Sequence, residues 1–190
     1  MKVAVFSTKS YDKQFFDELN SAYSHNLTYF EPRLTRETAS LAEDFPAICA
    51  FVNDHLDAGV LLTLKRQGTE LIALRSAGFN NVDLEAAEDL GLTVVRVPAY
   101  SPEAVAEHTI GLIMALNRKI HRAYARVREG NFSLEGLLGF TLRDQTVGII
   151  GTGKIGEHVA KILNGFGCKI LAHDPYPSET VHSLGADYTD

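Results

Sequence analysis

A glycine-rich run at residues 151–156 (GTGKIG) constrains the fold of this chain more than any other feature. It follows an apolar, strand-like stretch at residues 146–150 and opens a segment with helical periodicity. Gly151 permits a tight turn, Gly153 lets the backbone come close to a bound pyrophosphate, and Gly156 lets a helix pack closely on the preceding strand. The run therefore predicts a strand–turn–helix unit with a dinucleotide-binding turn.

The residues after the run complete this unit. Apolar residues recur with helical spacing and share one face of the predicted helix: Ile155, Val159, Ile162, Leu163 and Phe166. A second apolar strand at residues 168–172 leads to Asp174, 18 residues beyond Gly156, where a carboxylate can accept hydrogen bonds from ribose hydroxyls. The run alone is also compatible with a glycine-rich surface turn. Strand, glycines, helix, strand and acid in this order favour the dinucleotide site.

Asp174 also indicates which dinucleotide binds. Its charge would repel the 2′-phosphate of NADP, and residues 175–181 contain no Arg or Lys that would neutralise that phosphate. The pyrophosphate itself would lie on free backbone amides at the positive end of the helix. We therefore expect NAD as the cofactor. Its predicted contacts in this region are Gly151, Gly153, Lys154, Ile155, Gly156 and Asp174.

Composition and charge disfavour several other classes of protein. With 190 residues, 45% hydrophobic and 22% charged, the chain has an ordinary globular composition. Its net charge of −6 argues against nucleic-acid binding, and its one dense basic stretch, residues 118–128, is predicted to be a solvated or inter-subunit helix face. No stretch is apolar enough for a membrane span, and the N-terminus does not have the apolar length of a signal peptide.

The two cysteines indicate the compartment. Cys49 and Cys168 lie far apart in apolar, strand-like segments, and the sequence has no Cys or His spacing typical of a metal site. They are predicted to be buried free thiols in a reducing cytosol. We therefore expect a cytoplasmic protein with no metal site.

The first half of the chain predicts a parallel sheet. Strand-like and helix-like segments alternate from residue 2 onward, as they do in sheets with crossover helices. A helix over residues 11–23 would carry one apolar face. The fold class expected for residues 1–100 is α/β, with a flavodoxin-like domain.

The alternation changes near Pro98, and a new domain is predicted to begin at Ser101. Ser101 can cap a helix whose first residues are Pro102 and an acid, and this helix is predicted to be long, ending near Glu129. A Rossmann sheet has two β-α-β-α-β halves, and residues 101–190 supply only the first. We therefore expect an incomplete Rossmann domain here, and the chain to be the N-terminal part of a longer protein.

Four stretches carry a resemblance to a known family. They are residues 75–83 (RSAGFNNVD), 97–118, 151–156 and 173–177 (HDPYP). In this order and spacing they resemble the D-isomer-specific 2-hydroxyacid dehydrogenases, and within that family most closely the NAD-dependent D-lactate dehydrogenases. The resemblance extends over the whole chain and covers somewhat more than half of a typical family member.

The resemblance implies a set of substrate-binding residues. The backbone amides of Ala77 and Gly78 would hold the substrate carboxylate, and Tyr100 would lie over the small substrate at the hinge between domains. Val105 would lie against the nicotinamide ring, although a valine facing the core would have the same sequence pattern. Arg75 is ambiguous, since its guanidinium could steer the anionic substrate or pair structurally.

The resemblance places no catalytic residue in this chain. The family's carboxylate-binding arginine, its glutamate and its catalytic histidine all come later and are not matched here. His108 follows a glutamate in a predicted helix, where a structural role is more common. The chain alone is therefore expected to be inactive, because hydride transfer also needs a group that exchanges the alcohol proton.

The function implied by the resemblance is interconversion of pyruvate and D-lactate with NAD, in a homo-oligomer that acts on a small molecule without a nucleic-acid or membrane partner. Three alternatives remain. The chain could belong to a dehydrogenase for another small D-2-hydroxy acid, or to a non-catalytic, NAD-sensing protein similar to the corepressors of this fold. It could also be an oligomer-forming fragment with only a structural role, because no catalytic residue is visible in it.

Overall fold

The computed structural model describes all residues 1–190 as two compact units, Met1–Tyr100 and Ser101–Asp190. The division falls at the residue where the sequence predicts a domain boundary. Each unit has its own parallel sheet and its own hydrophobic core.

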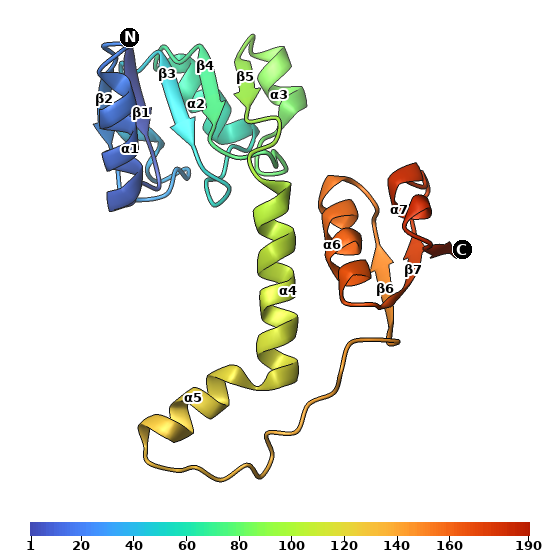
Figure 1. Cartoon of the computed structure of the whole chain (residues 1–190). Helices are drawn as coiled ribbons and strands as arrows, with labels where there is room; N and C mark the ends of the chain where they lie inside the picture. Colours follow the sequence, from blue (N-terminus) through green and yellow to red (C-terminus); the bar gives the residue numbers. More distant parts are fainter. The chain divides into compact units, whose positions relative to one another are not determined.

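The first unit contains one five-stranded sheet (Figure 1). Its strands are β1 (Lys2–Val5), β2 (Asn26–Tyr29), β3 (Ala47–Ala50), β4 (Leu71–Leu74) and β5 (Thr93–Arg96). All neighbouring strands are parallel and lie in the order β2-β1-β3-β4-β5. This is the flavodoxin-like order, so the predicted fold class is confirmed.

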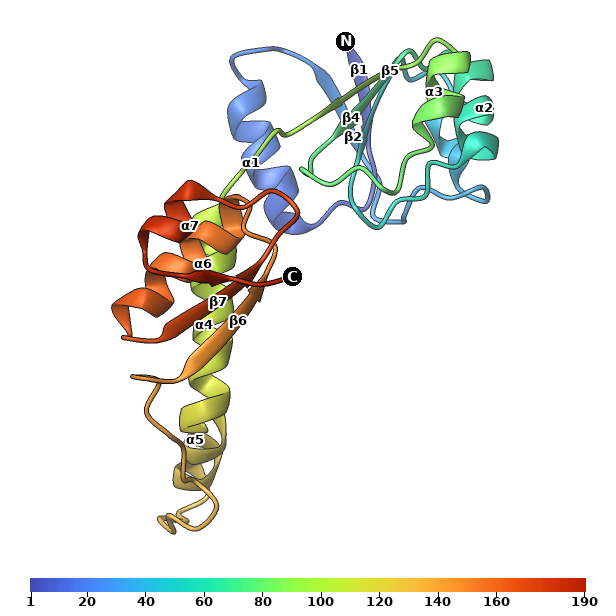
Figure 2. The same cartoon turned by 90° about the vertical axis from the view of Figure 1, so that its right-hand side faces the viewer.

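Helices cover the two faces of this sheet unequally. They are α1 (Ser10–Asn20), the 3-10 helix η1 (Ala39–Ala42), α2 (Ala58–Arg66) and α3 (Leu84–Asp89). Figure 2 shows α2 and α3 on one face and α1 on the other. The apolar side chains of α2 and α3 share a buried core with alternate residues of β3 and β4: Val60, Leu61, Leu64, Ala87, Ile48, Ile72 and Leu74.

Helix α1 differs from its sequence prediction in length and in burial. It ends at Asn20, whose side chain both accepts from the His25 N–H and donates to the His25 carbonyl, at 2.8 and 2.7 Å. These two bonds close the turn that follows the helix and prevent its continuation to Tyr23. The predicted apolar face is present, but its side chains are 56–70% exposed: Tyr11, Phe15, Leu19 and Tyr23.

The second unit contains a three-stranded parallel sheet, in the order β6-β7-β8. Its elements are α4 (Pro102–Arg118), α5 (Ile120–Arg128), β6 (Thr146–Ile150), α6 (Lys154–Gly165), β7 (Lys169–His173), α7 (Glu179–Ser183) and β8 (Asp187–Tyr188). From β6 to β8 the chain forms one β-α-β-α-β half of the Rossmann arrangement. Helix α4 packs against α6, and Ile110 joins the core that α6 forms with the strands.

The long helix predicted after Ser101 is interrupted, so this prediction was wrong in one respect. Lys119 adopts the left-handed conformation, with φ +53° and ψ +34°, and separates α4 from α5. Just before the break, the Asn117 side chain makes two hydrogen bonds to the backbone of Phe140, at 2.8 and 2.9 Å. This contact joins positions 23 residues apart, and helical periodicity does not reveal it. No helix in the chain has both the length and the apolar character needed to cross a bilayer.

Candidate functional site

The glycine turn between β6 and α6 has the geometry of a phosphate-binding turn. Gly151 has φ +91°, in the left-handed region that favours glycine. A side chain at Gly156 would overlap the carbonyl oxygen of Gly151, so only glycine allows α6 to pack this closely on the turn. The space beside Gly153 is open. Gly151 is therefore restricted by its backbone conformation and Gly156 by a close neighbour, while the space at Gly153 leaves room for a bound group.

Helix α6 begins directly at this turn. Gly153 is its N-cap, and no side chain caps the first turn. Lys154 and Ile155 are the first two helical residues, and both side chains are exposed, Ile155 at 44%. The sequence placed Ile155 on the apolar face of the helix, but the buried contacts come from Ala160 and Leu163 further along.

Asp174 follows β7 and bonds to the glycine turn. Its Oδ2 accepts from the backbone N–H of Thr152 at 2.6 Å and from the Thr152 hydroxyl at 3.2 Å, while its Oδ1 accepts from the Tyr176 N–H at 2.8 Å. The Thr152 backbone hydrogen bond is the main reason why the pKa of Asp174 is lowered, followed by that of Tyr176. Asp174 is thus a carboxylate at neutral pH.

Sequence reasoning did not single out Thr152. Its side chain is buried, and both its amide and its hydroxyl hold Asp174. A hydroxyl residue between the first two glycines of the turn was the available signal. Its significance depends on β6 and β7 being hydrogen-bonded neighbours, which brings positions 152 and 174 together.

A second candidate site follows β4 in the first unit. The loop after β4 contains Ala77, which is half-buried, and Gly78, which is exposed. The Ser76 hydroxyl donates to the Gly78 carbonyl at 2.8 Å, and Nη1 of Arg96 donates to the Ala77 carbonyl at 3.1 Å. The backbone carbonyls of Ala77 and Gly78 thus accept hydrogen bonds from side chains of the same unit. The loop lies at the carboxyl end of a parallel strand, where folds of this type bind ligands.

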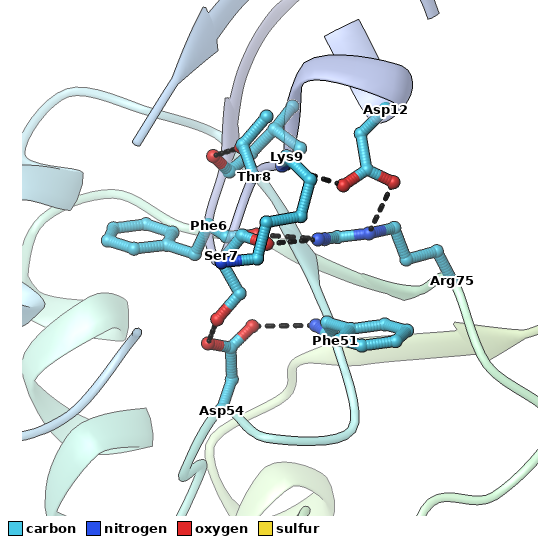
Figure 3. Close-up of polar contacts among 9 residues, drawn as sticks. Phe6, Ser7, Thr8, Lys9, Asp12, Phe51, Asp54 and Arg75 are labelled. Atoms are coloured by element: carbon cyan, nitrogen blue, oxygen red, sulfur yellow. Dashed lines mark hydrogen bonds and ion pairs between the residues drawn. The ribbon is translucent and has the colours of Figure 1, made fainter. Parts of the chain in front are cut away.

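The remaining predicted residues are not part of the glycine turn or of the loop at residues 76–78. Tyr100, the last residue of the first unit, is 70% exposed. Val105 lies in the first turns of α4 and is also exposed, as is His108. Arg75 directly follows β4, and its guanidinium bonds to backbone carbonyls of the same unit (Figure 3). No group of three or more His, Cys, Asp or Glu side chains is placed to hold a metal ion.

Comparison with known proteins finds 2-hydroxyacid dehydrogenases that are similar in sequence to the whole chain. A D-lactate dehydrogenase of Escherichia coli (strain K12) is 57% identical over 190 residues, which is the whole chain and 58% of that relative. A 2-hydroxyacid dehydrogenase homolog of Haemophilus influenzae is 56% identical over the whole chain and 57% of its own length. The chain therefore spans less than two thirds of the length of these relatives.

Solved structures show the same likeness. The apo-structure of D-lactate dehydrogenase from Escherichia coli matches with a TM-score of 0.92, over the whole chain and 60% of that structure. D-lactate dehydrogenase from Aquifex aeolicus, complexed with NAD and lactic acid, matches at 33% identity with a TM-score of 0.84, over 98% of the chain and 55% of that structure.

The family profile gives the assignment. The profile described as D-isomer specific 2-hydroxyacid dehydrogenase, catalytic domain, matches residues 3–186. This match covers nearly the whole chain, and the family predicted from the four sequence stretches is confirmed. The chain belongs to the D-isomer specific 2-hydroxyacid dehydrogenase family.

Proposed function

We propose that the chain is part of an NAD-dependent D-lactate dehydrogenase, which interconverts pyruvate and D-lactate. The NAD part of the proposal rests on the 2.6 Å hydrogen bond from the Thr152 amide to Asp174, because it fixes a carboxylate beside a glycine turn at a helix start. The likeness to D-lactate dehydrogenases over the whole chain supports the same activity.

The residues of the turn fit NAD. The open space at Gly153 and the uncapped start of α6 would take the pyrophosphate, with the amides of Lys154 and Ile155 nearby. Asp174 accepts three hydrogen bonds, two on Oδ2 and one on Oδ1, so about one of its four lone-pair sites, on Oδ1, stays free to accept a ribose hydroxyl. Its charge would disfavour a 2′-phosphate. When bound, NAD would supply the hydride acceptor, and Val105 of α4 would lie against the nicotinamide.

The first unit would bind the substrate. The amides of Ala77 and Gly78 would hold the carboxylate at the end of β4, because an ordered loop presents N–H groups at fixed positions. Tyr100 would contact the substrate with its ring and hydroxyl. The group that exchanges the alcohol proton would come from the rest of the complete protein, as the family resemblance implies.

We also propose that the complete protein is a cytoplasmic homo-oligomer. Exposed apolar side chains gather on α4, α5 and the loop after them: Leu112, Leu116, Ile120, Tyr124, Val127, Phe132, Leu134 and Leu138. Such a concentration of exposed apolar side chains is typical of a surface covered by another protein surface. Light scattering of the complete protein measures its mass and tests this proposal.

Steady-state kinetics of the complete protein test the proposed activity. We expect NADH-dependent reduction of pyruvate, with D-lactate as the product in a chiral assay and much lower kcat/KM with NADPH. A higher kcat/KM for a longer 2-oxo acid would assign a different D-2-hydroxy acid as the substrate. Tight NADH binding without turnover of any 2-oxo acid would favour the NAD-sensing alternative.

A further inference from the structure

Arg75 connects several strands of the first unit through its backbone and its side chain. Its backbone N–H continues the β3–β4 ladder to the Ala50 carbonyl, and its side chain extends across β3 to the end of β1. There Nη1 donates to the Phe6 carbonyl and Nη2 to the Ser7 carbonyl, both at 2.9 Å (Figure 3). One side chain thereby connects the carboxyl ends of β4 and β1.

The charge of this guanidinium is balanced inside the unit. Nε of Arg75 lies 3.6 Å from Oδ1 of Asp12, within ion-pair range and beyond hydrogen-bond length. The side chains of Arg75 and Asp12 are only 12% and 14% exposed. The guanidinium carbon lies 4.8 Å from the centre of the Phe51 ring, which follows β3. Two of the five N–H donors of Arg75, its charge and one face of its guanidinium are therefore engaged within the unit, while Nε makes no hydrogen bond and faces Asp12.

The backbone that receives these bonds is itself tightly held. Ser7 has φ +52°, a conformation that few residues other than glycine adopt. Its hydroxyl donates to the fully buried Asp54 at 2.6 Å, and the other oxygen of Asp54 accepts from the Phe51 N–H at 2.6 Å. Asp54 thus joins the ends of β1 and β3, as Arg75 joins those of β1 and β4 (Figure 3). Unusual backbone conformations persist where the surroundings fix them in this way.

We infer that Arg75 is a positioning residue, which contacts no substrate and instead fixes the loop at residues 76–78 by bonding the end of β4 to β1. The inference rests on the proposed function, in which the amides of Ala77 and Gly78 bind the substrate carboxylate. Those amides lie two and three residues after Arg75. Hydrogen bonds of the guanidinium to two carbonyls fix Arg75, the residue before the loop, and thereby limit the freedom of the loop. Asp12 in turn holds the guanidinium.

Asp12→Asn distinguishes positioning from direct contact by the sign of its effect. If Arg75 positions the loop, Asp12→Asn loosens it and raises the KM of the complete protein for pyruvate. If Arg75 touches the substrate, removing the competing carboxylate strengthens anion binding and lowers that KM. Arg75→Lys keeps the charge but loses the paired hydrogen bonds. We expect it to raise the KM about tenfold or more, since hydrogen bonds to charged groups are worth roughly that much.

A matched control lies on the same helix. Asp17 of α1 bonds to the Tyr29 hydroxyl at 2.7 Å and does not contact Arg75. Asp17→Asn removes the same charge from α1 and should leave the KM within about twofold of wild type. NADH affinity should be unchanged in all three variants, because the proposed dinucleotide site belongs to the second unit. A lower KM in Asp12→Asn overturns the inference.

Hydrogen–deuterium exchange of the complete protein, without substrate, tests the inference independently of activity. The peptide containing residues 76–78 should exchange several-fold faster in Arg75→Lys and Asp12→Asn than in wild type and Asp17→Asn. Equal exchange in all four proteins would contradict the positioning role. If wild type does not reduce pyruvate, the proposed function fails, but this measurement still decides whether Arg75 fixes the loop.

Discussion

At the scale of single residues, backbone amides hold carboxylates in place, and one of these carboxylates belongs to the proposed dinucleotide site. Asp174 takes its low pKa first from the Thr152 amide, and the same hydrogen bond fixes its position beside the turn. Asp57 shows the same effect at the start of α2, where the Val60 amide is the first cause of its lowered pKa. Fixed N–H groups therefore set the location of these side chains and favour their charged form.

Asp174→Ala should weaken NADH binding by the complete protein about ten- to a hundredfold, because hydrogen bonds to a charged group are worth about 1.5–3 kcal/mol. The ratio of the affinity for NADH to the affinity for NADPH should also decrease. Asp174→Asn is the matched variant, since its amide oxygen can still accept from Thr152 while the negative charge is lost. Titration with both nucleotides measures these effects. An unchanged preference in both variants would exclude Asp174 from the ribose site.

Tyr100→Ala should lower kcat/KM for pyruvate in the complete protein and leave NADH affinity nearly intact, because we propose that this exposed ring contacts the substrate rather than the dinucleotide. Tyr100→Phe keeps the ring and removes the hydroxyl, so it separates the two contributions. Steady-state kinetics and NADH titration together check the prediction. Equal loss of both quantities would indicate a folding or hinge role instead.

At the scale of elements, the close packing of α6 on the glycine turn leaves no space for a side chain at Gly156. The Gly151 carbonyl occupies that space. Gly165, at the other end of α6, has nothing within contact distance of an added Cβ. The two glycines of one helix therefore have opposite tolerance to substitution.

Gly156→Ala should destabilise the second unit by about 1–3 kcal/mol, the usual range for overpacking, and should reduce NADH affinity because the turn must shift. Gly165→Ala should be neutral or stabilising by up to about 1 kcal/mol, because alanine is the better helix former. Chemical denaturation and NADH titration of both variants provide the comparison. If Gly156→Ala kept the stability and NADH affinity of Gly165→Ala, the turn would tolerate the displacement and the prediction would be wrong.

At the scale of the whole molecule, the chain combines two parallel sheets with different proposed tasks. The sheet of Met1–Tyr100 carries the loop proposed to bind the substrate carboxylate, and that of Ser101–Asp190 carries the dinucleotide turn. The chain's histidines include none that sequence or structure identifies as a proton donor for a 2-oxo acid. Because the family resemblance matches its catalytic histidine to no residue of this chain, we propose that binding groups and proton-transfer groups lie on different parts of the complete protein.

The 190-residue chain, purified alone, should not reduce pyruvate with NADH at enzyme-like rates, even if it binds NADH. Acid–base catalysis is typically worth about 10²–10⁴ in rate, and the catalytic histidine of the family is not matched in this chain. Initial rates for this chain and for the complete protein, measured side by side, test this. Comparable rates in the two would place the catalytic group within residues 1–190.

The sequence by itself determined the family, the parallel α/β fold and the position of the glycine turn. These follow from local features, since strand–helix alternation, glycines and a terminal acid are all read along the chain. The conformation of Gly151 and the crowding at Gly156 agree with what those glycines predict.

Only the tertiary structure decided the features that depend on distant residues. The break at Lys119, the exposure of the apolar face of α1, the role of Thr152 and the contacts of Arg75 with Phe6, Ser7 and Asp12 all belong to this group. The contacts of Thr152 and Arg75 depend on which strands become neighbours in a sheet, and Asn117 near the break at Lys119 bonds to a loop that returns to the helix end. Side-chain hydrogen bonds formed across such distances leave no periodic pattern in the sequence.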